Sequence, residues 1–394
     1  MRGLACAIQG PWSEVLHTIL RTNMPTNIPS SQRALQQGED GRLRLVTDAA
    51  IPSLLPGYVL VKTHAVALNP SDHKITTGFP IPGAYSGSDF SGTVVQVAED
   101  VDTAACPLGG RVCGAAFGFS PSHRLASGAF AEYVRVRTDL LLRIPTTPHD
   151  GDLEGIGLLG AATLMTALST CSLAFWSQDA LDLEGTPEAP LEHEKPTPVL
   201  VYGGSTATGT IAVQLLRLSG YDPIATCSPR NFDLVRGRGA SAVFDYSAPD
   251  VAAQIKTATA GRLRYVLDCI SDAESATACY GAIQRPGGRY ASLERVPAEL
   301  LTRRRAVRAG FVLAAEAFGE DIELGHDGYD RPASAEKHEL AVQSLAMLQR
   351  LLDSGKLKAH PIELLEGGLQ GVIGGLDVLA AKGISGKKLV SIID

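Results

Sequence analysis

The run VLVYGGSTATGTIAVQLLRLSG, residues 199–220, constrains the fold more than any other part of the sequence. An apolar strand leads through a glycine-rich loop into an apolar helix, which is the order of a dinucleotide-binding unit. Glycines in such a loop let the backbone approach a pyrophosphate, and the positive end of the helix faces the anion. The loop, GGSTATG at 203–209, departs from the G-x-G-x-x-G spacing. A tight structural turn is the alternative, but the flanking strand and helix favour a phosphate loop.

Strand-like and helix-like segments alternate after this loop, from residue 199 to residue 320. Such alternation predicts a Rossmann domain with a doubly wound parallel sheet. Upstream, the segments 58–69 and 92–98 have strand-forming residues and are separated by turns rich in glycine and proline, so they predict a smaller β-rich domain. The fold class is therefore α/β with two unlike domains.

The ends of the chain complete this organisation. Residues 1–32 have weak periodicity and are assigned to an N-terminal extension without a function. The acidic, proline-rich segment 177–198 is interpreted as a linker or surface insertion. A helix is predicted over 337–355, and the final strand is expected to rejoin the N-terminal domain. The substrate domain thus comprises 33–198 and 321–394, and the Rossmann domain 199–320.

Bulk composition excludes several classes of function. The formal net charge of −7 argues against nucleic-acid binding, and the one arginine cluster, at 303–308, is interpreted as a solvated helix face. Seven scattered cysteines form neither a disulfide framework nor a zinc knuckle and fit a reducing compartment. No apolar stretch approaches the ~20 residues of a spanning helix. We therefore expect a cytoplasmic protein without a membrane segment.

The residues after the second predicted strand favour NADPH over NADH. NAD-binding proteins place an acidic residue there for the ribose 2′-hydroxyl, whereas this chain has Ser228, Pro229, Arg230 and Asn231, with no acid before Asp233. The planar guanidinium of Arg230 suits a 2′-phosphate, although an exposed arginine at a helix start is the alternative. Tyr246, after the third strand, is either an adenosine contact or a surface side chain. In the loop, Ser205, Thr206, Ala207 and Thr208 are the expected phosphate contacts.

Seven runs together resemble the medium-chain dehydrogenase/reductase superfamily over residues 32–394: VKTHAVALNPSDHK, YSGSDFSGTVVQV, GAFAEYVRV, the phosphate loop with its helix, RGASAVFDY, VLDCI and GISGKKLVSII. The resemblance implies a GroES-like substrate domain built from both chain ends and a cleft against the Rossmann domain. Where zinc-dependent members have Gly-His-Glu, this chain has Gly87-Ser88-Asp89, and it has no closely spaced cysteines. We therefore expect no metal site and place the chain in the zinc-free branch.

Within that branch, GGSTATGT, ATCSPRNFDL and LRYVLDCISDAES resemble the stand-alone, trans-acting enoyl reductases of fungal polyketide synthases, of the lovastatin type. The resemblance implies NADPH-dependent reduction of the α,β double bond of an acyl thioester in secondary metabolism. The implied partner is the acyl carrier protein of a polyketide synthase, itself possibly fused to a nonribosomal peptide synthetase. The alternatives are a free-standing quinone or enone oxidoreductase and a non-catalytic NADPH-binding protein. We expect a monomer.

The same resemblance implies roles for individual residues. Asn69 and Pro70 are read as a helix start. Lys74 is assigned to a ribose hydroxyl or to the charge of an enolate, with a surface lysine as the alternative. Thr166 is assigned to the nicotinamide or the thioester carbonyl, with a helix-interior threonine as the alternative. Solvent and Lys74 both remain candidates for the proton donor. Further positions near the cofactor are Ser71, Asp72, His73, Leu293, Glu294, Ile384 and Ser385, and the acyl chain is expected to meet Leu164, Ala315, Glu316, Ala317, Phe318 and Gly319.

Overall fold

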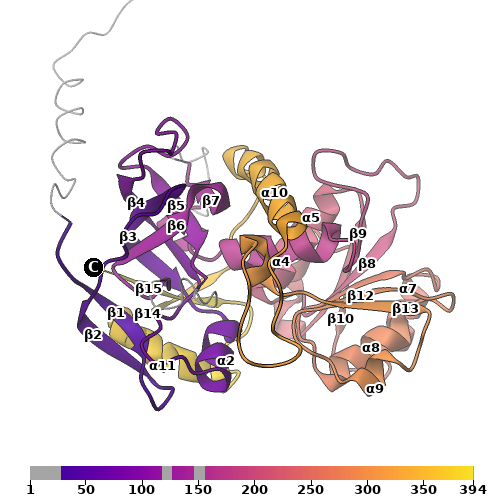
Figure 1. The fold of residues 1–394 in the computed structure, drawn as a ribbon. Helices are drawn as coiled ribbons and strands as arrows, with labels where there is room; N and C mark the ends of the chain where they lie inside the picture. Colours follow the sequence, from indigo (N-terminus) through magenta and orange to yellow (C-terminus); the bar gives the residue numbers. More distant parts are fainter. Residues whose placement is uncertain (1–27, 118–126, 146–155, 394) are drawn as a thin grey trace, which may run out of the picture.

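The protein, seen in a computed structural model, is described over residues 28–117, 127–145 and 156–393. It has two lobes, each built on its own large sheet, with helices between them (Figure 1). Most of the predicted N-terminal extension, residues 1–27, lies outside the described residues. The α/β fold class predicted from the sequence is confirmed.

The first lobe holds a six-stranded, wholly parallel sheet within the described residues, in the order β10-β9-β8-β11-β12-β13. This is the strand order of the doubly wound dinucleotide-binding fold. Its strands are β8 (Pro198–Tyr202), β9 (Asp222–Cys227), β10 (Ala242–Asp245), β11 (Tyr265–Asp268), β12 (Gly288–Ser292) and β13 (Val307–Phe311).

Burial on both faces explains why β8 reads as a continuous apolar run. Val199 and Val201 belong to the core on one face, and Leu200 and Tyr202 belong to the core on the other. Strands that are covered on both sides need apolar residues at every position rather than at alternate ones. The connecting elements are α5 (Ala207–Leu218), the 3₁₀ turn η2 (Pro229–Asn231), α6 (Phe232–Gly237), α7 (Val251–Ala258), α8 (Ala273–Ala282) and α9 (Ala298–Leu301).

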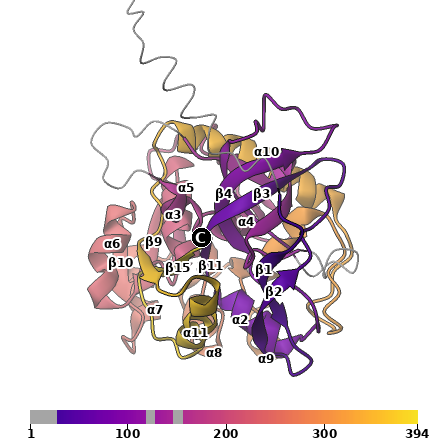
Figure 2. The same cartoon turned by 90° about the vertical axis from the view of Figure 1, so that its left-hand side faces the viewer.

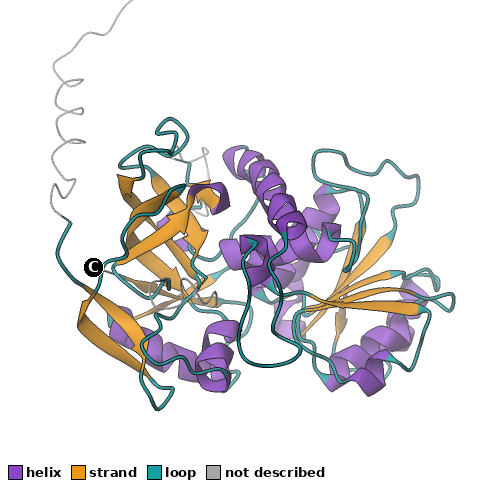
Figure 3. Cartoon of the chain, viewed as in Figure 1, coloured by secondary structure: helices purple, strands orange, loops and turns teal. Residues whose placement is uncertain are grey.

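The second lobe is β-rich, as Figure 3 shows, and its main sheet has seven strands among the described residues. The sheet runs β14-β15-β3-β4-β5-β7, and β6 also pairs with β3. Its strands are β3 (Tyr58–Ala67), β4 (Asp89–Val97), β5 (Arg111–Ala115), β6 (Tyr133–Arg137), β7 (Leu141–Arg143), β14 (Ile362–Leu365) and β15 (Lys388–Ile392). A hairpin of β1 (Gln32–Gln37) and β2 (Leu43–Ala49) and the helices α2 (Pro70–Gly78), α3 (Leu158–Ala161) and α11 (Gly368–Ala380) complete the lobe, with the 3₁₀ turn η1 (Thr138–Leu140).

The chain end returns to this lobe. β15 pairs antiparallel with β3, so that Val390 faces Ala67, and it packs against α11, which lies below it in Figure 2. The sequence-based expectation that the last strand rejoins the N-terminal part is therefore confirmed.

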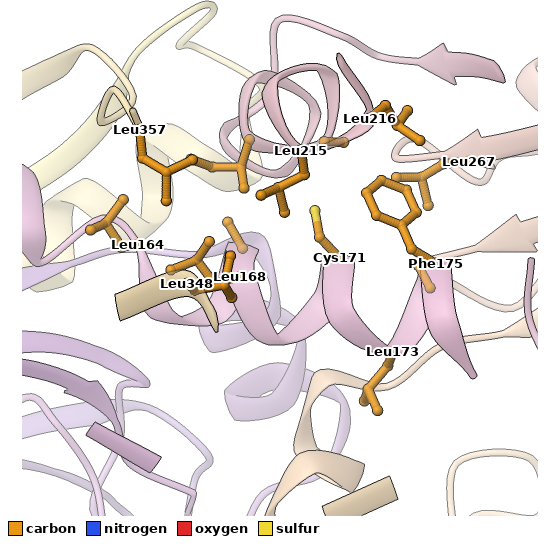
Figure 4. Close-up of a cluster of buried hydrophobic side chains, with 14 of the residues drawn as sticks. Leu164, Leu168, Cys171, Leu173, Phe175, Leu215, Leu216, Leu267, Leu348 and Leu357 are labelled. Atoms are coloured by element: carbon orange, nitrogen blue, oxygen red, sulfur yellow. The ribbon is translucent and has the colours of Figure 1, made fainter. Parts of the chain in front are cut away.

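Two helices join the lobes at their centre. α4 (Met165–Trp176) and α10 (Ala335–Asp353) fall inside the range predicted for the substrate domain, yet their buried side chains share one core with α5. Leu168, Leu215 and Leu348, one from each helix, lie in this cluster (Figure 4). The same cluster holds Cys113 of β5 and Leu142 of β7, so α4 and α10 pack against both lobes, and the domain boundaries proposed from the sequence remain a prediction.

One sequence interpretation is wrong. The arginines at 303–308 do not form a helix face, because they follow α9 and enter β13. Arg304 instead donates to the carbonyl oxygens of Tyr280 at 2.6 Å and Ile283 at 2.9 Å, at the end of α8. Within the described part of the chain, no helix is both long and apolar enough to cross a bilayer.

Candidate active site

The glycine-rich loop lies between β8 and α5, and its glycines are required by close packing. Gly203 has φ +84°, and a Cβ at Gly209 would stand 2.3 Å from the carbonyl oxygen of Gly203. Thr206 caps α5 by accepting the N–H of Gly209 at 2.9 Å. Residues 205–208 are part-exposed between buried neighbours, at the helix start where a phosphate would be held.

This loop sits where the strand order of the sheet reverses, between β8 and β11. Ligands of doubly wound sheets bind at that point, outside the carboxyl ends of the strands. Ile270, just after β11, is 42% exposed, and its side chain lies beside Gly203. An exposed apolar side chain next to a phosphate loop fits a dinucleotide that covers both.

The residues after β9 gather next to the loop. Asn231 donates through its side-chain amide to the hydroxyls of Ser205 at 3.2 Å and Ser385 at 2.8 Å. Three of the predicted cofactor-binding residues are therefore in contact, although they are far apart in sequence. Arg230 is exposed and forms no ion pair with any described residue, and Tyr246 is 50% exposed.

Lys74 lies on α2 and faces the Rossmann lobe. Its ammonium forms an ion pair with Glu294 at 2.7 Å, and the hydroxyl of Tyr329 donates to the same carboxylate at 2.5 Å. Burial tends to raise the pKa of Glu294, but the hydrogen bonds from Lys74 and Tyr329 outweigh it and lower that pKa. Burial and the Glu294 carboxylate raise the pKa of Tyr329 to about 12. Lys74 and Glu294, both predicted site residues, are thus held together.

Tyr329 belongs to the segment 319–334, which crosses between the lobes and is orange in Figure 1. Its ring packs edge-on against Phe79 of the β-rich lobe at 5.2 Å and against Phe311 of the Rossmann lobe at 5.7 Å. The segment therefore ties both lobes together beside Lys74.

Asp72 has a structural position at the start of α2. Its carboxylate accepts the N–H of Asn69 at 2.8 Å and the hydroxyl of Ser88 at 2.8 Å, and its side chain is buried. Burial, opposed by these hydrogen bonds, raises its pKa to about 6. The predicted helix start at Asn69 and Pro70 is confirmed, while Ser71 and His73 are part-exposed on either side of Asp72.

Asp89, the last residue of Gly87-Ser88-Asp89, is fully buried in a polar network. One carboxylate oxygen accepts the backbone N–H and the hydroxyl of Thr166, each at 2.8 Å. The other oxygen accepts the ammonium of Lys388 at 2.5 Å and the amide of Asn69 at 3.1 Å. No group of three or more His, Cys, Asp or Glu side chains within the described ranges is arranged to hold a metal ion.

Among the residues predicted to meet the acyl chain, Leu164, Glu316 and Ala317 are buried. The carboxylate of Glu316 forms an ion pair with Lys337 at 2.7 Å. Phe318 stacks on Phe117 at a centroid distance of 5.2 Å. The 3₁₀ turn η3 (Ala314–Phe318) thus packs against α10 and leaves Ala315, Phe318 and Gly319 part-exposed.

Family models and relatives agree with this geometry. Residues 55–146 match the alcohol dehydrogenase GroES-like domain, and residues 207–304 match the zinc-binding dehydrogenase domain. The trans-enoyl reductase TwmE of Talaromyces wortmannii is 66% identical over 94% of this chain and 100% of its own length. The trans-enoyl reductase poxP of Penicillium oxalicum is 44% identical over 93% of this chain and 94% of its own.

The chain belongs to the trans-enoyl reductase family. These enzymes are oxidoreductases that act on carbon–carbon double bonds, within the medium-chain dehydrogenase/reductase superfamily. Solved structures share the fold at lower identity. CurK enoyl reductase is 18% identical with a TM-score of 0.68, covering 92% of this chain and all of its own. A quinone oxidoreductase from Coxiella burnetii is 22% identical with a TM-score of 0.65, covering 92% and 99%.

In this trans-enoyl reductase the sequence missed three residues of the site region. Tyr329 and Lys388 are recognisable only through partners distant in the chain. His360 is the third: it is 3% exposed, its Nδ1 lies 2.9 Å from the hydroxyl of Thr210 on α5, and its Nε2 has no hydrogen-bond partner among the described residues. Burial, together with Lys388 and Arg238, lowers its pKa to about 3, so the ring stays neutral. Tyr329 and His360 lie in none of the runs that carry the resemblance, and Lys388 lies in GISGKKLVSII, which gives no sign of its partner Asp89.

Proposed function

We propose that this protein is an NADPH-dependent, trans-acting enoyl reductase that reduces the α,β double bond of a polyketide intermediate bound to a carrier protein. The observation that carries the proposal is the 66% identity with a trans-enoyl reductase over nearly the whole of both chains. The proposed partner is the acyl carrier protein of a polyketide synthase, either alone or fused to a nonribosomal peptide synthetase. We further propose that the enzyme is a cytoplasmic monomer, and the six described cysteines, all free, fit a reducing compartment.

The described residues fit the cofactor. Residues 205–208 are part-exposed at the start of α5, where a pyrophosphate would bind, and the hydroxyl of Ser205 accepts a hydrogen bond from Asn231. Arg230, exposed and without an ion partner in the described ranges, is available to a 2′-phosphate, and no carboxylate competes at that position. NADPH, when bound, supplies a hydride for the β-carbon of the substrate.

The ammonium of Lys74 supplies positive charge for the proposed reaction. Reduction at the β-carbon leaves negative charge on the thioester oxygen, and an ammonium near that oxygen stabilises it. The Lys74 side chain is 53% exposed although it is paired with Glu294, so one side of the ammonium remains open to a ligand. The α-carbon then takes a proton, from Lys74 or from solvent.

The experiment is incubation of the purified protein with NADPH and an enoyl thioester, offered on pantetheine and on an acyl carrier protein. We expect NADPH oxidation with stoichiometric formation of the saturated thioester, faster on the carrier protein. Turnover of small quinones with no reduction of either thioester would replace the proposal by a quinone oxidoreductase. Tight NADPH binding without oxidation by any acceptor would indicate a binding protein.

A further inference from the structure

The hydrogen-bonding partners of Asp89 determine the direction in which Thr166 donates. The ammonium of Lys388 and the side-chain amide of Asn69 can only donate to one carboxylate oxygen, and the backbone N–H of Thr166 can only donate to the other. Asp89 therefore acts wholly as an acceptor. The hydroxyl of Thr166 has a single hydrogen, and at 2.8 Å it is directed to Asp89.

Thr166 is also one of the two part-exposed positions of α4, the other being Trp176 at its end. Residues 161–165 and 167–175 are buried, and Thr166 alone in this stretch is part-exposed. Since its hydrogen is committed to Asp89, its oxygen has only lone pairs left for a ligand. Thr166 is thus a hydrogen-bond acceptor in the site, and a ligand group that contacts it has to be a donor.

We propose that Asp89, held by Lys388, is a positioning residue that fixes Thr166 as an acceptor for the carboxamide NH₂ of the nicotinamide. The inference rests on the proposed function. A thioester carbonyl, and the enolate oxygen derived from it, are acceptors and gain nothing from an oxygen that cannot donate. Thr166 therefore orients the cofactor, and stabilisation of the enolate falls to another donor such as Lys74. The pair Asp89–Lys388 acts at a distance, through the hydroxyl it orients.

The test compares two cofactors that differ in one donor. NADPH carries a carboxamide, whereas the acetylpyridine analogue of NADPH carries a methyl ketone, which keeps the carbonyl and lacks the NH₂. Fluorescence titration gives the Kd of each for the wild type, Thr166→Val and the matched control Thr166→Ser. We expect Thr166→Val to weaken NADPH binding about 3- to 10-fold, the value of one hydrogen bond, and to leave the analogue unchanged. Thr166→Ser, which keeps the hydroxyl, should bind both like the wild type.

The positioning role has its own readout, the ratio of the two Kd values. In Asp89→Leu/Lys388→Met the acceptor is gone and the Thr166 hydroxyl is free to turn, so the preference for NADPH over the analogue should shrink toward one. Loss of structure would weaken the binding of both cofactors equally and leave the ratio of their Kd values unchanged. If Thr166→Val weakened the binding of NADPH and of the analogue equally, the hydroxyl would have to donate to the carbonyl that the two cofactors share. That result would overturn the inference. Since binding is measured without a thioester, failure of the proposed reaction is recognised separately.

Discussion

At the scale of a single residue, the proposed choice of NADPH rests on Arg230. Its guanidinium is exposed after β9 and has no ion partner within the described ranges, so it is free to bind a phosphate. We predict that Arg230→Ala raises the KM for NADPH roughly tenfold, as expected for loss of a charge-assisted hydrogen bond at an exposed site. The KM for NADH should change less than about twofold, because the 2′-hydroxyl lacks the charge that Arg230 binds. Steady-state kinetics with both cofactors measures the difference.

Arg236, on the helix that follows Arg230, is the matched control. Arg236 on α6 is similarly exposed but is paired with Asp233 at 3.8 Å. Arg236→Ala should leave both KM values close to those of the wild type. Equal effects of the two substitutions would mean that general positive charge, and not a phosphate contact at Arg230, attracts the cofactor.

The lowered pKa of His360 predicts how the stability of the protein depends on pH. Its pKa in the folded protein is about 3, below the ordinary 6.5, so between those values the unfolded chain binds a proton that the folded protein does not. The stabilising contribution is complete above pH 6.5 and is lost as the pH falls through that window. For this one group the loss at pH 5 is ~2 kcal/mol relative to pH 7.

The measurement is the fall in thermal midpoint from pH 7 to pH 5, with each variant compared with itself. His360→Asn removes the titrating group and should show a smaller fall than the wild type. His193→Asn, at an exposed histidine, is the control and should fall as the wild type does. An identical fall in all three proteins would mean that His360 is not the group that takes up the proton.

Individual site residues were predictable where they follow directly after a strand that the sequence pattern reveals. The loop GGSTATG and the segment 228–231 lie beside recognisable strands, and the structure brings Ser205 and Asn231 into contact. The pairs Glu294–Tyr329 and Asp89–Lys388 join positions 35 and 299 residues apart, and no periodicity or spacing encodes such contacts. Asp89 could be read only as a missing zinc ligand, since its partners come from three other segments.

At the scale of elements, long periodic segments were predicted and short ones were not. The helix expected at 337–355 is α10, two residues earlier at both ends, because Ser334 caps it by accepting the N–H of Lys337. The four-residue helices α3 and α9 are too short to show a 3.6-residue period. Turn η3, predicted to line an acyl channel, has Glu316 and Ala317 buried and Ala315 and Phe318 part-exposed, and that role stays a prediction.

Close packing between β8 and α5 predicts that alanine at Gly209 of α5 destabilises the protein, whereas alanine at Gly374 of α11 does not. In Gly209→Ala the new Cβ would meet backbone atoms, at 2.3 Å from the oxygen of Gly203 and 2.8 Å from the Cα of Gly204, and backbone cannot rotate away. We expect a loss of stability of about 1–3 kcal/mol, together with weaker NADPH binding because the loop is displaced. Thermal unfolding and cofactor titration measure the two effects.

Gly374 provides the opposite case. It lies inside α11 with nothing within 4 Å of a Cβ, so Gly374→Ala meets no clash and gains helix propensity. It should raise stability by about 0.5–1 kcal/mol and leave NADPH binding unchanged. If both alanines destabilise alike, close packing at the loop is not what requires Gly209.

At the scale of the whole molecule, the chain end connects the two lobes of the site. Within a few residues, Ser385 contacts Asn231 beside the phosphate loop, Lys388 contacts Asp89 in the β-rich lobe, and β15 pairs with β3. From this topology we expect changes in the last residues of the sequence to affect cofactor binding and folding together. The terminal strand was predictable from its pattern, but its role in fixing the site follows only from the closed fold.

Substitution of Lys388 therefore tests how strongly the contact between the last strand and the β-rich lobe stabilises the protein. Lys388→Met leaves the fully buried Asp89 carboxylate without its counter-charge, so we expect a loss of about 3–5 kcal/mol in the free energy of unfolding. Asp89→Leu/Lys388→Met removes both charges and should recover part of that loss, because the N–H of Thr166 and the amide of Asn69 still lose their acceptor, and the two effects are non-additive. The adjacent Lys387→Met is the matched control, because Lys387 and its partner Glu363 are half-exposed and contribute ~0–1 kcal/mol. Equal losses at positions 387 and 388, measured by denaturant unfolding, would show that the buried pair does not hold the chain end in place.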